Sequence, residues 1–272
     1  MNQKAPPEPG AARPRPAFPA PLASVVGRAG PAPKAAPVAV KGVGAAARAA
    51  PMVTPSGAGM DSSAVRMAMV RKLAAQGLSD DAVLQAFATV ERHRFVDSAL
   101  VAQAYEDTSL PIGLGQTISK PSVVGRMLEL LRAVGGLAQG RVLEIGTGCG
   151  YQAALLSVLC REVYSMERLR GLHEKARENL RPLRLRNVHL ILGDGMAGFP
   201  KGGPYSGIIA AAGGADLPQC WLDQLAVGGR LVAPAELSPG RQSLVVVDRT
   251  ARGYTREVLE PVWFVPLKSG LA

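Results

Sequence analysis

The stretch VLEIGTGCGYQAALL, residues 142–156, decides the fold because it sets a glycine cluster between a short apolar run and an Ala/Leu-rich segment. The apolar run is typical of a buried strand, and the second segment is typical of a helix. In an open α/β sheet this junction binds ligands, since glycine backbone permits close approach and the helix N-terminus presents unpaired N–H groups. The glycines have the spacing G-x-G-x-G, whereas the dinucleotide-binding fingerprint would place a glycine where this chain has Tyr151.

Outward from this junction, strand-like and helix-like segments alternate. Strands are expected at 141–145, 162–166, 188–192, 206–211 and 230–235, and helices at 151–160, 168–183 and 217–226. Such alternation implies right-handed βαβ units, and so an α/β fold with a doubly wound, mostly parallel sheet covered on both faces. Two further strands, at 242–250 and 255–267, are joined by a turn around Gly253 and are expected to extend one edge of the sheet, antiparallel.

Further helices are expected ahead of the sheet, as an N-terminal helical preface. The pattern predicts them at 61–77, 79–90, 98–107 and 121–135. Ser79 is the expected N-cap of the second, and Pro121 lies in the first turn of the last. Residues 1–60 are rich in Ala, Pro, Gly and Val and cannot bury enough apolar surface to offset the entropy of ordering. We therefore expect a disordered tail over 1–60 and one folded domain over 61–272.

The positive charge of the chain is concentrated in the tail. A formal net charge of +10 would normally suggest nucleic-acid binding. Residues 1–60, however, hold seven of the basic side chains and a single acid, Glu8, so a solubilising tail is favoured over a nucleic-acid or membrane role. No segment is apolar over the roughly 18 residues of a transmembrane helix, and the start lacks a secretory h-region, so a cytoplasmic protein is expected. The three cysteines, Cys149, Cys160 and Cys220, lack metal-ligand spacing, which predicts free thiols and no metal site.

Carboxylates follow the first three predicted strands in order. Glu144 lies just before the glycine loop, and Glu167 ends the second strand, where a carboxylate can accept hydrogen bonds from both ribose hydroxyls of a nucleoside. Asp194 follows the third strand, where it can accept from the exocyclic amine of adenine, and the small Gly195 leaves room for the ring. Glu167 or Asp194 alone could be an ordinary helix cap. The ordered set of the glycine loop, Glu167 after the second strand and Asp194 after the third favours an S-adenosylmethionine site, and the loop lacks the Lys-Ser/Thr of a P-loop.

The stretch YEDTSLPIGLGQTISKP, residues 105–121, is neither a strand nor a helix by pattern. On residue chemistry alone, the hydroxyls of Thr117 and Ser119 would be caps for the helix that begins at Pro121. Taken with the S-adenosylmethionine site, however, this stretch resembles the protein-L-isoaspartate O-methyltransferase family. The resemblance rests on the segments RHRFVD (92–97), AYEDTSLPIGLGQTISKP (104–121), RVLEIGTGCGYQAALL (141–156), VYSMERLRGL (163–172), GDG (193–195) and FVPL (264–267).

The resemblance implies an S-adenosylmethionine-dependent methyltransferase with a Rossmann-like fold. Its substrate would be a protein or peptide with an L-isoaspartyl residue, whose free α-carboxylate is methylated so that repair proceeds through a succinimide. Ser119 corresponds to the family's active-site serine, and Gln116, Thr117 and Ile118 to the lining of the cleft between donor and substrate. Together, residue chemistry and resemblance predict a cofactor-binding set of Gln116, Thr117, Ile118, Ser119, Glu144, Gly146, Gly148, Gly150, Glu167, Asp194 and Gly195.

Some residues depart from the family pattern or invite another role. Lys120 stands where Gln or Ala is more usual, either near the substrate carboxylate or, as favoured, pointing to solvent. The loop at 210–218 is smaller and richer in glycine than its counterpart in the family. His93 is expected to be a structural polar residue, and His173 to lie inert on the solvent side of its helix.

Other functions remain open at this point. The chain could be a methyltransferase of nucleic acid or of another carboxylate, or a non-catalytic cofactor-binding module. The loop after the fourth strand has no Asp/Asn-Pro-Pro-aromatic turn, which amino-methylating nucleic-acid enzymes use to hold a flipped base. Intact Ser119, Glu167 and Asp194 argue against a module without turnover, which fold alone could not do. We expect a monomer with no specific nucleic-acid or membrane partner.

Overall fold

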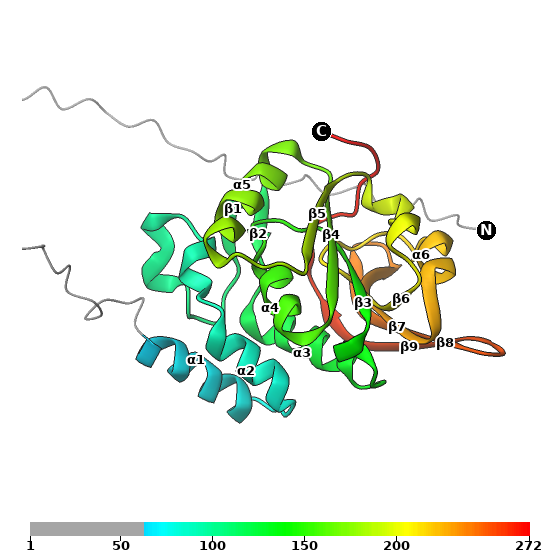
Figure 1. Ribbon diagram of the computed structural model, residues 1–272, viewed down its shortest axis with the longest axis horizontal. Helices are drawn as coiled ribbons and strands as arrows, with labels where there is room; N and C mark the ends of the chain where they lie inside the picture. Colours follow the sequence, from blue (N-terminus) through cyan, green and yellow to red (C-terminus); the bar gives the residue numbers. More distant parts are fainter. Residues whose placement is uncertain (1–62) are drawn as a thin grey trace, which may run out of the picture. The chain divides into compact units, whose positions relative to one another are not determined.

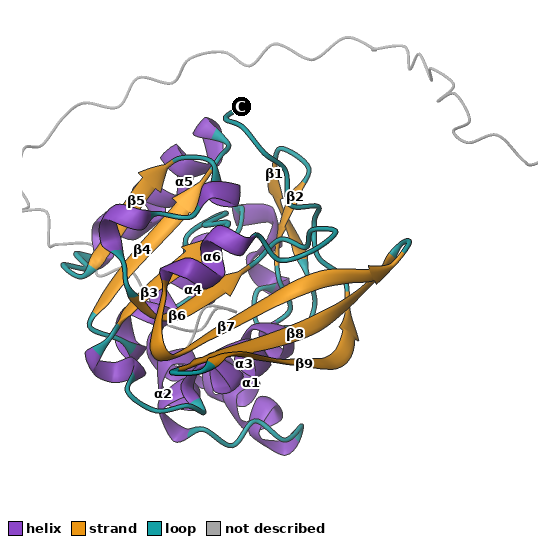
Figure 2. Cartoon of the chain, turned by 90° about the vertical axis from the view of Figure 1, so that its right-hand side faces the viewer, coloured by secondary structure: helices purple, strands orange, loops and turns teal. Residues whose placement is uncertain are grey.

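A seven-stranded sheet forms the centre of the computed structural model, which describes residues 63–272 (Figure 1). Its strand order is β5-β4-β3-β6-β7-β8-β9. The strands are β3 Arg141–Ile145, β4 Glu162–Glu167, β5 Val188–Leu192, β6 Tyr205–Ala210, β7 Leu225–Ser238, β8 Arg241–Thr250 and β9 Gly253–Val262. The strands β3 to β7 pair in parallel, and β8 pairs antiparallel with both β7 and β9, which confirms the predicted edge (Figure 2). The tail predicted over 1–60 lies outside the described residues.

Both faces of the sheet are covered, as the doubly wound prediction requires. The covering helices are α3 Pro121–Arg132, α4 Tyr151–Leu159, α5 Arg170–Leu180 and α6 Gln219–Gln224. Successive residues of β3 show the two faces, because side chains alternate along a strand. Val142 belongs to the core that includes α3, α4 and α5, and Leu143 belongs to a second core with Trp221 of α6. None of the helices within residues 63–272 is long and apolar enough to cross a membrane.

The helical preface has the predicted helices but a different cap and a shorter final element. It consists of α1 Ser63–Ala75, α2 Asp81–Thr89 and the 3₁₀ turns Arg92–Phe95 and Ser98–Gln103. The prediction that Ser79 caps the second helix was wrong, because the Asp80 carboxylate accepts from the first amides of α2. Ser79 instead donates from its hydroxyl to Glu129 at 2.9 Å. The helix expected at 98–107 is only the second 3₁₀ turn.

The stretch 105–121, which had no regular pattern, contains a β-hairpin. β1 Leu110–Gly113 pairs antiparallel with β2 Gln116–Ile118. The two turn residues, Leu114 and Gly115, have φ angles of 52° and 70°. A two-residue hairpin turn of type I′ needs positive φ at both positions, and Asn or Gly is usual there. The leucine at the first turn position hid the hairpin from sequence reasoning.

The order of the strands reverses between β3 and β6. From β3 the chain continues outward to β4 and β5, and from β6 it continues outward the other way to β7. The last residues of the two strands, Ile145 and Ala210, are partners in the parallel register. Open α/β sheets bind ligands at the carboxyl ends of strands where the order reverses. This topology therefore places the site beside Ile145 and Ala210.

Candidate active site

A cavity of about 420 Å³ opens at the carboxyl ends of β3, β4 and β6. Its walls are the β1–β2 hairpin, the glycine loop after β3, Ala211 and Ala212 after β6, and the C-terminal segment Val265–Lys268. The volume lies within the range of about 300–1,000 Å³ that small-molecule sites occupy. The predicted residues that line it are Gln116, Thr117, Ile118, Ser119, Gly146, Gly148, Glu167 and Gly195. Glu144, Gly150 and Asp194 are not among its lining residues.

The glycine loop folds back onto the end of β4. Gly146, Gly148 and Gly150 have φ angles of 91°, 56° and 91°, a backbone region that favours glycine. The amide of Gly146 donates to Met166 O at 2.8 Å, which ties the loop to the neighbouring strand. Gly150 serves packing rather than the cavity, because a Cβ there would lie 3.0 Å from Leu180 Cδ1.

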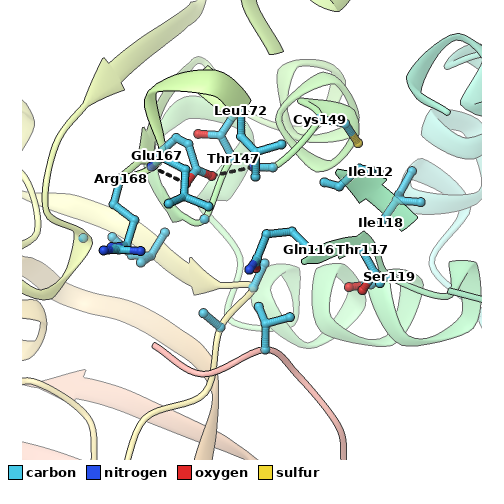
Figure 3. Close-up of a pocket in the computed structure, with 18 of the residues that line it drawn as sticks. Ile112, Gln116, Thr117, Ile118, Ser119, Thr147, Cys149, Glu167, Arg168 and Leu172 are labelled. Carbon is cyan, nitrogen blue, oxygen red and sulfur yellow. Dashed lines mark hydrogen bonds between the residues drawn. The ribbon is translucent and has the colours of Figure 1, made fainter. Parts of the chain in front are cut away.

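Glu167 is anchored to the glycine loop and faces the cavity (Figure 3). Its Oε2 accepts from Gly148 N at 2.9 Å, and its Oε1 accepts from Leu169 N at 3.0 Å. Each carboxylate oxygen has a second lone-pair direction, so both oxygens can accept one more hydrogen bond from a ligand. Glu167 therefore holds the glycine loop and can also accept hydrogen bonds from two neighbouring hydroxyl groups of a ligand.

Glu144 lies beneath the glycine loop, where it is fully buried. The Ser165 hydroxyl donates to its Oε2, and the Thr147 hydroxyl hydrogen-bonds to Ser165 at 2.6 Å. Burial raises the pKa of the Glu144 carboxyl to about 8, and the nearby Glu167 charge adds to the shift. Glu144 does not line the cavity. Through the Ser165 hydroxyl it supports Thr147 in the glycine loop.

Replacing Glu144 by glutamine is expected to make the stability of the protein less dependent on pH. In the folded chain this carboxyl stays neutral between its ordinary pKa of 4.5 and its raised value of about 8, while in the unfolded chain it ionises. Its contribution to the free energy of unfolding is thus complete below pH 4.5 and is lost as pH rises toward 8. The melting temperature of Glu144→Gln relative to the wild type should rise across that window. A difference that stays constant would contradict the buried neutral acid.

The Ser119 end of the cavity lies opposite Glu167, with Gln116 between them (Figure 3). Neither Thr117 nor Ser119 caps α3, so the capping interpretation was wrong: Lys120 occupies the N-cap position without a side-chain hydrogen bond. An acceptor for the first turn of α3 comes instead from Asp107, whose Oδ1 accepts from Ser122 N at 2.9 Å. Within residues 63–272 the Ser119 hydroxyl has no hydrogen-bond partner, so it is available to a ligand in the cavity.

The C-terminal segment forms a wall that sequence reasoning did not predict. Gly270 N donates to Asp194 Oδ2 at 2.7 Å, and Arg168 Nε donates to Gly270 O at 2.8 Å. Ala272 N donates to Arg168 O at 3.0 Å. The other Asp194 oxygen accepts from Met196 N, so both oxygens already have a partner. These contacts are made mostly by backbone groups, and FVPL was the one signal of this wall in the sequence.

The glycines of the loop at 210–218 are explained by this wall. Gly213 N donates to Val265 O at 2.9 Å, and Leu267 N donates to Gly213 O at 2.8 Å. A Cβ at Gly213 would lie 2.7 Å from the amide carbon of Gln242, a side chain that is itself hydrogen-bonded to Phe264. The small residues therefore let the C-terminal segment reach the cavity. Gly195 similarly permits close packing, since a Cβ there would lie 2.6 Å from Ile145 Cγ2.

Lys120, His93 and His173 lie outside the cavity lining. Lys120 is exposed, as favoured from the sequence. His93 has the expected structural contact, between its Nδ1 and the Tyr105 hydroxyl at 2.7 Å. The expectation that His173 lies on the solvent side of its helix was wrong: the residue is half-buried, and its Nε2 is fully buried without a hydrogen-bond partner in residues 63–272. It follows the buried Leu172 in α5.

Comparison with known proteins agrees with this geometry. The family model for protein-L-isoaspartate(D-aspartate) O-methyltransferase matches residues 64–272. A protein-L-isoaspartate O-methyltransferase of Methylibium petroleiphilum is 56% identical over 263 residues, which cover 95% of this chain and 97% of the relative. One of Leptothrix cholodnii is 60% identical over 218 residues, 79% of this chain and 77% of the relative.

Solved structures share the fold. A protein-L-isoaspartate O-methyltransferase structure has a TM-score of 0.69 and 30% identity, over 76% of this chain and 67% of that chain. A Plasmodium falciparum structure in complex with S-adenosyl-L-homocysteine has a TM-score of 0.67 at 24% identity, over 75% and 98% of the two chains. With the family model matching nearly all of the described residues, the chain belongs to the protein-L-isoaspartate(D-aspartate) O-methyltransferase family.

Proposed function

We propose that this chain methylates the free α-carboxylate of L-isoaspartyl residues in damaged proteins, with S-adenosylmethionine as the donor. The observation that carries the proposal is one cavity with Glu167 at one end and, at the other, the Ser119 hydroxyl, which has no hydrogen-bond partner in residues 63–272. One end suits a nucleoside and the other a carboxylate. The curated relatives of this chain carry the same activity in their names.

The residues of the cavity fit the donor. Glu167 retains acceptor capacity for ribose hydroxyls, and the backbone of Gly146 and Gly148 leaves space at the strand end. Gly195 presents only backbone where the adenine would lie, and Asp194 would accept from its amine with lone pairs not used by Gly270 and Met196. The glycine loop carries no lysine for a phosphate group. S-adenosylmethionine supplies an electrophilic methyl group on a sulfonium sulfur.

Methyl transfer to a carboxylate needs little acid–base catalysis from the protein. The acceptor carboxylate is already ionised at neutral pH, so this chain has to align it and exclude water rather than remove a proton. The Ser119 hydroxyl donates a hydrogen bond to the carboxylate or the adjoining amide and so fixes its direction. Gln116, Thr117 and Ile118 close the same side of the cavity. The methyl ester then cyclises to a succinimide without further catalysis, and hydrolysis returns part of it to normal aspartate.

The function is tested by labelled methyl transfer to two peptides that differ only in an isoaspartyl or an aspartyl linkage. We expect label on the isoaspartyl peptide alone. The label should be released by base, because a carboxyl ester is hydrolysed by base whereas an N-methyl group is not. RNA included as a third acceptor separates the nucleic-acid alternative. Equal labelling of both peptides, or label on the RNA, would contradict the proposal.

We further propose that the enzyme acts as a cytoplasmic monomer on protein and peptide substrates. Cys149, Cys160 and Cys220 are all free thiols, which suits a reducing compartment. Sedimentation of the purified chain with and without S-adenosyl-L-homocysteine measures the oligomeric state. A stable dimer in both conditions would overturn the monomer.

Deleting residues 1–60 is expected to leave kcat on short isoaspartyl peptides unchanged. The family match begins at residue 64, and the tail has the composition of a segment without its own core. The measurement is steady-state kinetics of the full chain and the shortened chain under the same conditions. Loss of activity or of folding would show that the tail belongs to the domain.

A further inference from the structure

Arg92, the first residue of RHRFVD, is a cation whose side chain is fully buried. Its exposed fraction is 0%, and it forms no salt bridge within residues 63–272. A buried charge is costly unless it is hydrogen-bonded, and the Arg92 guanidinium is hydrogen-bonded to backbone carbonyls through Nε and Nη2, while its Nη1 has no partner within residues 63–272. The function proposed above uses none of this motif.

The guanidinium donates to backbone on both sides of the hairpin. Its Nε donates to Ala104 O at 2.8 Å, before the hairpin. Its Nη2 donates to Ser119 O at 2.8 Å, after the hairpin, and more weakly to Thr108 O at 3.4 Å. One rigid fork thus fixes both ends of the segment that carries Gln116, Thr117 and the Ser119 hydroxyl.

The same guanidinium contacts the cofactor side of the cavity. Its Cζ lies 4.9 Å from the centre of the Tyr151 ring, a distance at which a cation is attracted to an aromatic face. Tyr151 is the first residue of α4, follows the glycine loop directly and lines the cavity. The ring is held in turn by Phe95, at 5.4 Å between ring centres. Arg92 therefore lies between the wall that carries Ser119 and the helix that begins at the glycine loop.

We propose that Arg92 is a positioning residue that holds the Ser119 hydroxyl in register with the glycine loop. The proposal rests on the proposed function and deepens it, because it names the residue that sets the distance between acceptor and donor. A lysine in its place keeps the charge but loses the planar fork, so it cannot hold Ala104 O and Ser119 O together while it covers the Tyr151 ring. Arg92 acts through Ser119 and touches neither reactant.

The first test compares Arg92→Lys with the wild type in steady-state kinetics and in calorimetric titration with S-adenosyl-L-homocysteine. We expect kcat to fall by about tenfold to hundredfold, the range that small misplacements of reacting groups produce. The KM for the isoaspartyl peptide and the affinity for S-adenosyl-L-homocysteine should change by less than about threefold, because neither contact involves Arg92. A KM effect with unchanged kcat would overturn the proposal.

Arg66 offers a matched control in the same helical preface. Its Nε donates to Ala88 O at 2.7 Å, its Nη1 lies 3.5 Å from Glu91 Oε1, and its side chain is 13% exposed; within residues 63–272 it forms no hydrogen bond or ion pair with β1, β2 or α4. Arg66→Lys should lower the melting temperature and leave kcat within about twofold of the wild type, as expected for an independent site. If Arg66→Lys lowers kcat as much as Arg92→Lys does, the effect is one of general stability and the proposal fails.

A double-mutant cycle with Ser119→Ala then tests whether Arg92 acts through the serine. Once the hydroxyl is absent its position no longer matters, so Arg92→Lys should reduce kcat by less than about threefold in the Ser119→Ala background. An equal loss in both backgrounds would contradict the proposal, as would an Arg92→Lys chain that does not fold at 25 °C. Activity of the wild type on the isoaspartyl peptide tests the proposed function separately, so the failure of one is distinguishable from the failure of the other.

Discussion

Replacing Glu167 by alanine is expected to weaken binding of S-adenosyl-L-homocysteine by about a hundredfold or more. The carboxylate offers an acceptor to each of two ribose hydroxyls, and hydrogen bonds to a charged group contribute about 1.5–3 kcal/mol each. The substitution also frees Gly148 N and Leu169 N, which the carboxylate holds in the present structure. Calorimetric titration of the variant and the wild type measures the change directly.

Glu162 gives the matched control, because it lies at the other end of the same strand. Its carboxylate contacts His189 and takes no part in the cavity. Glu162→Ala should therefore bind S-adenosyl-L-homocysteine with the affinity of the wild type. Wild-type affinity in Glu167→Ala would refute the assignment of Glu167 to the ribose and would leave it only the role of holding the loop.

The second large effect is expected for Ser119→Ala, whose kcat should fall by about tenfold to hundredfold while cofactor affinity persists. The magnitude corresponds to the loss of one hydrogen bond to a charged group in a site that excludes water. Because the hydroxyl has no partner within residues 63–272, its removal leaves no other side chain unsatisfied. Steady-state kinetics with an isoaspartyl peptide gives kcat, and calorimetry gives the affinity.

The neighbouring hydroxyl of Ser122 provides the control for this substitution. Ser122 lies in the first turn of α3, where its backbone N–H donates to Asp107, and its side chain does not line the cavity. Ser122→Ala should keep the kcat of the wild type. If Ser119→Ala also turns over at the wild-type rate, Ser119 is not a residue of the reaction.

The sheet and its glycine loop could be predicted because their signals are local. Buried parallel strands are short apolar runs, and the positive φ angles of Gly146, Gly148 and Gly150 require the residue type that is present. Helix caps were less certain, since Ser79 and Asp80 are both good caps and the choice between them depends on Glu129, which is distant in the chain. The chemistry of the single residues Ser79 and Asp80 could not decide which of them caps α2.

The cavity is lined by most of the predicted site residues but not by Glu144, Gly150 or Asp194. The resemblance already implied a cleft between donor and substrate, and Glu167 and Ser119 both line the cavity. The hairpin was missed because Leu114 has a positive φ angle, which leucine rarely adopts, so the sequence gives no turn signal at this position. Asp194 was assigned to adenine, with a helix cap as the alternative. One of its oxygens does cap Met196 N, and the other holds Gly270 of the C-terminal wall, which is built mostly from backbone hydrogen bonds.

The central claim is that the cavity methylates a carboxyl group whose ester begins repair. The most direct measurement follows one isoaspartyl peptide by chromatography and mass spectrometry during incubation with the wild-type chain and S-adenosylmethionine. We predict a product heavier by one methyl group, its conversion to a succinimide with loss of methanol, and accumulation of the aspartyl peptide. A methylated product that persists at alkaline pH, or no formation of the aspartyl peptide above the rate without protein, would contradict the account.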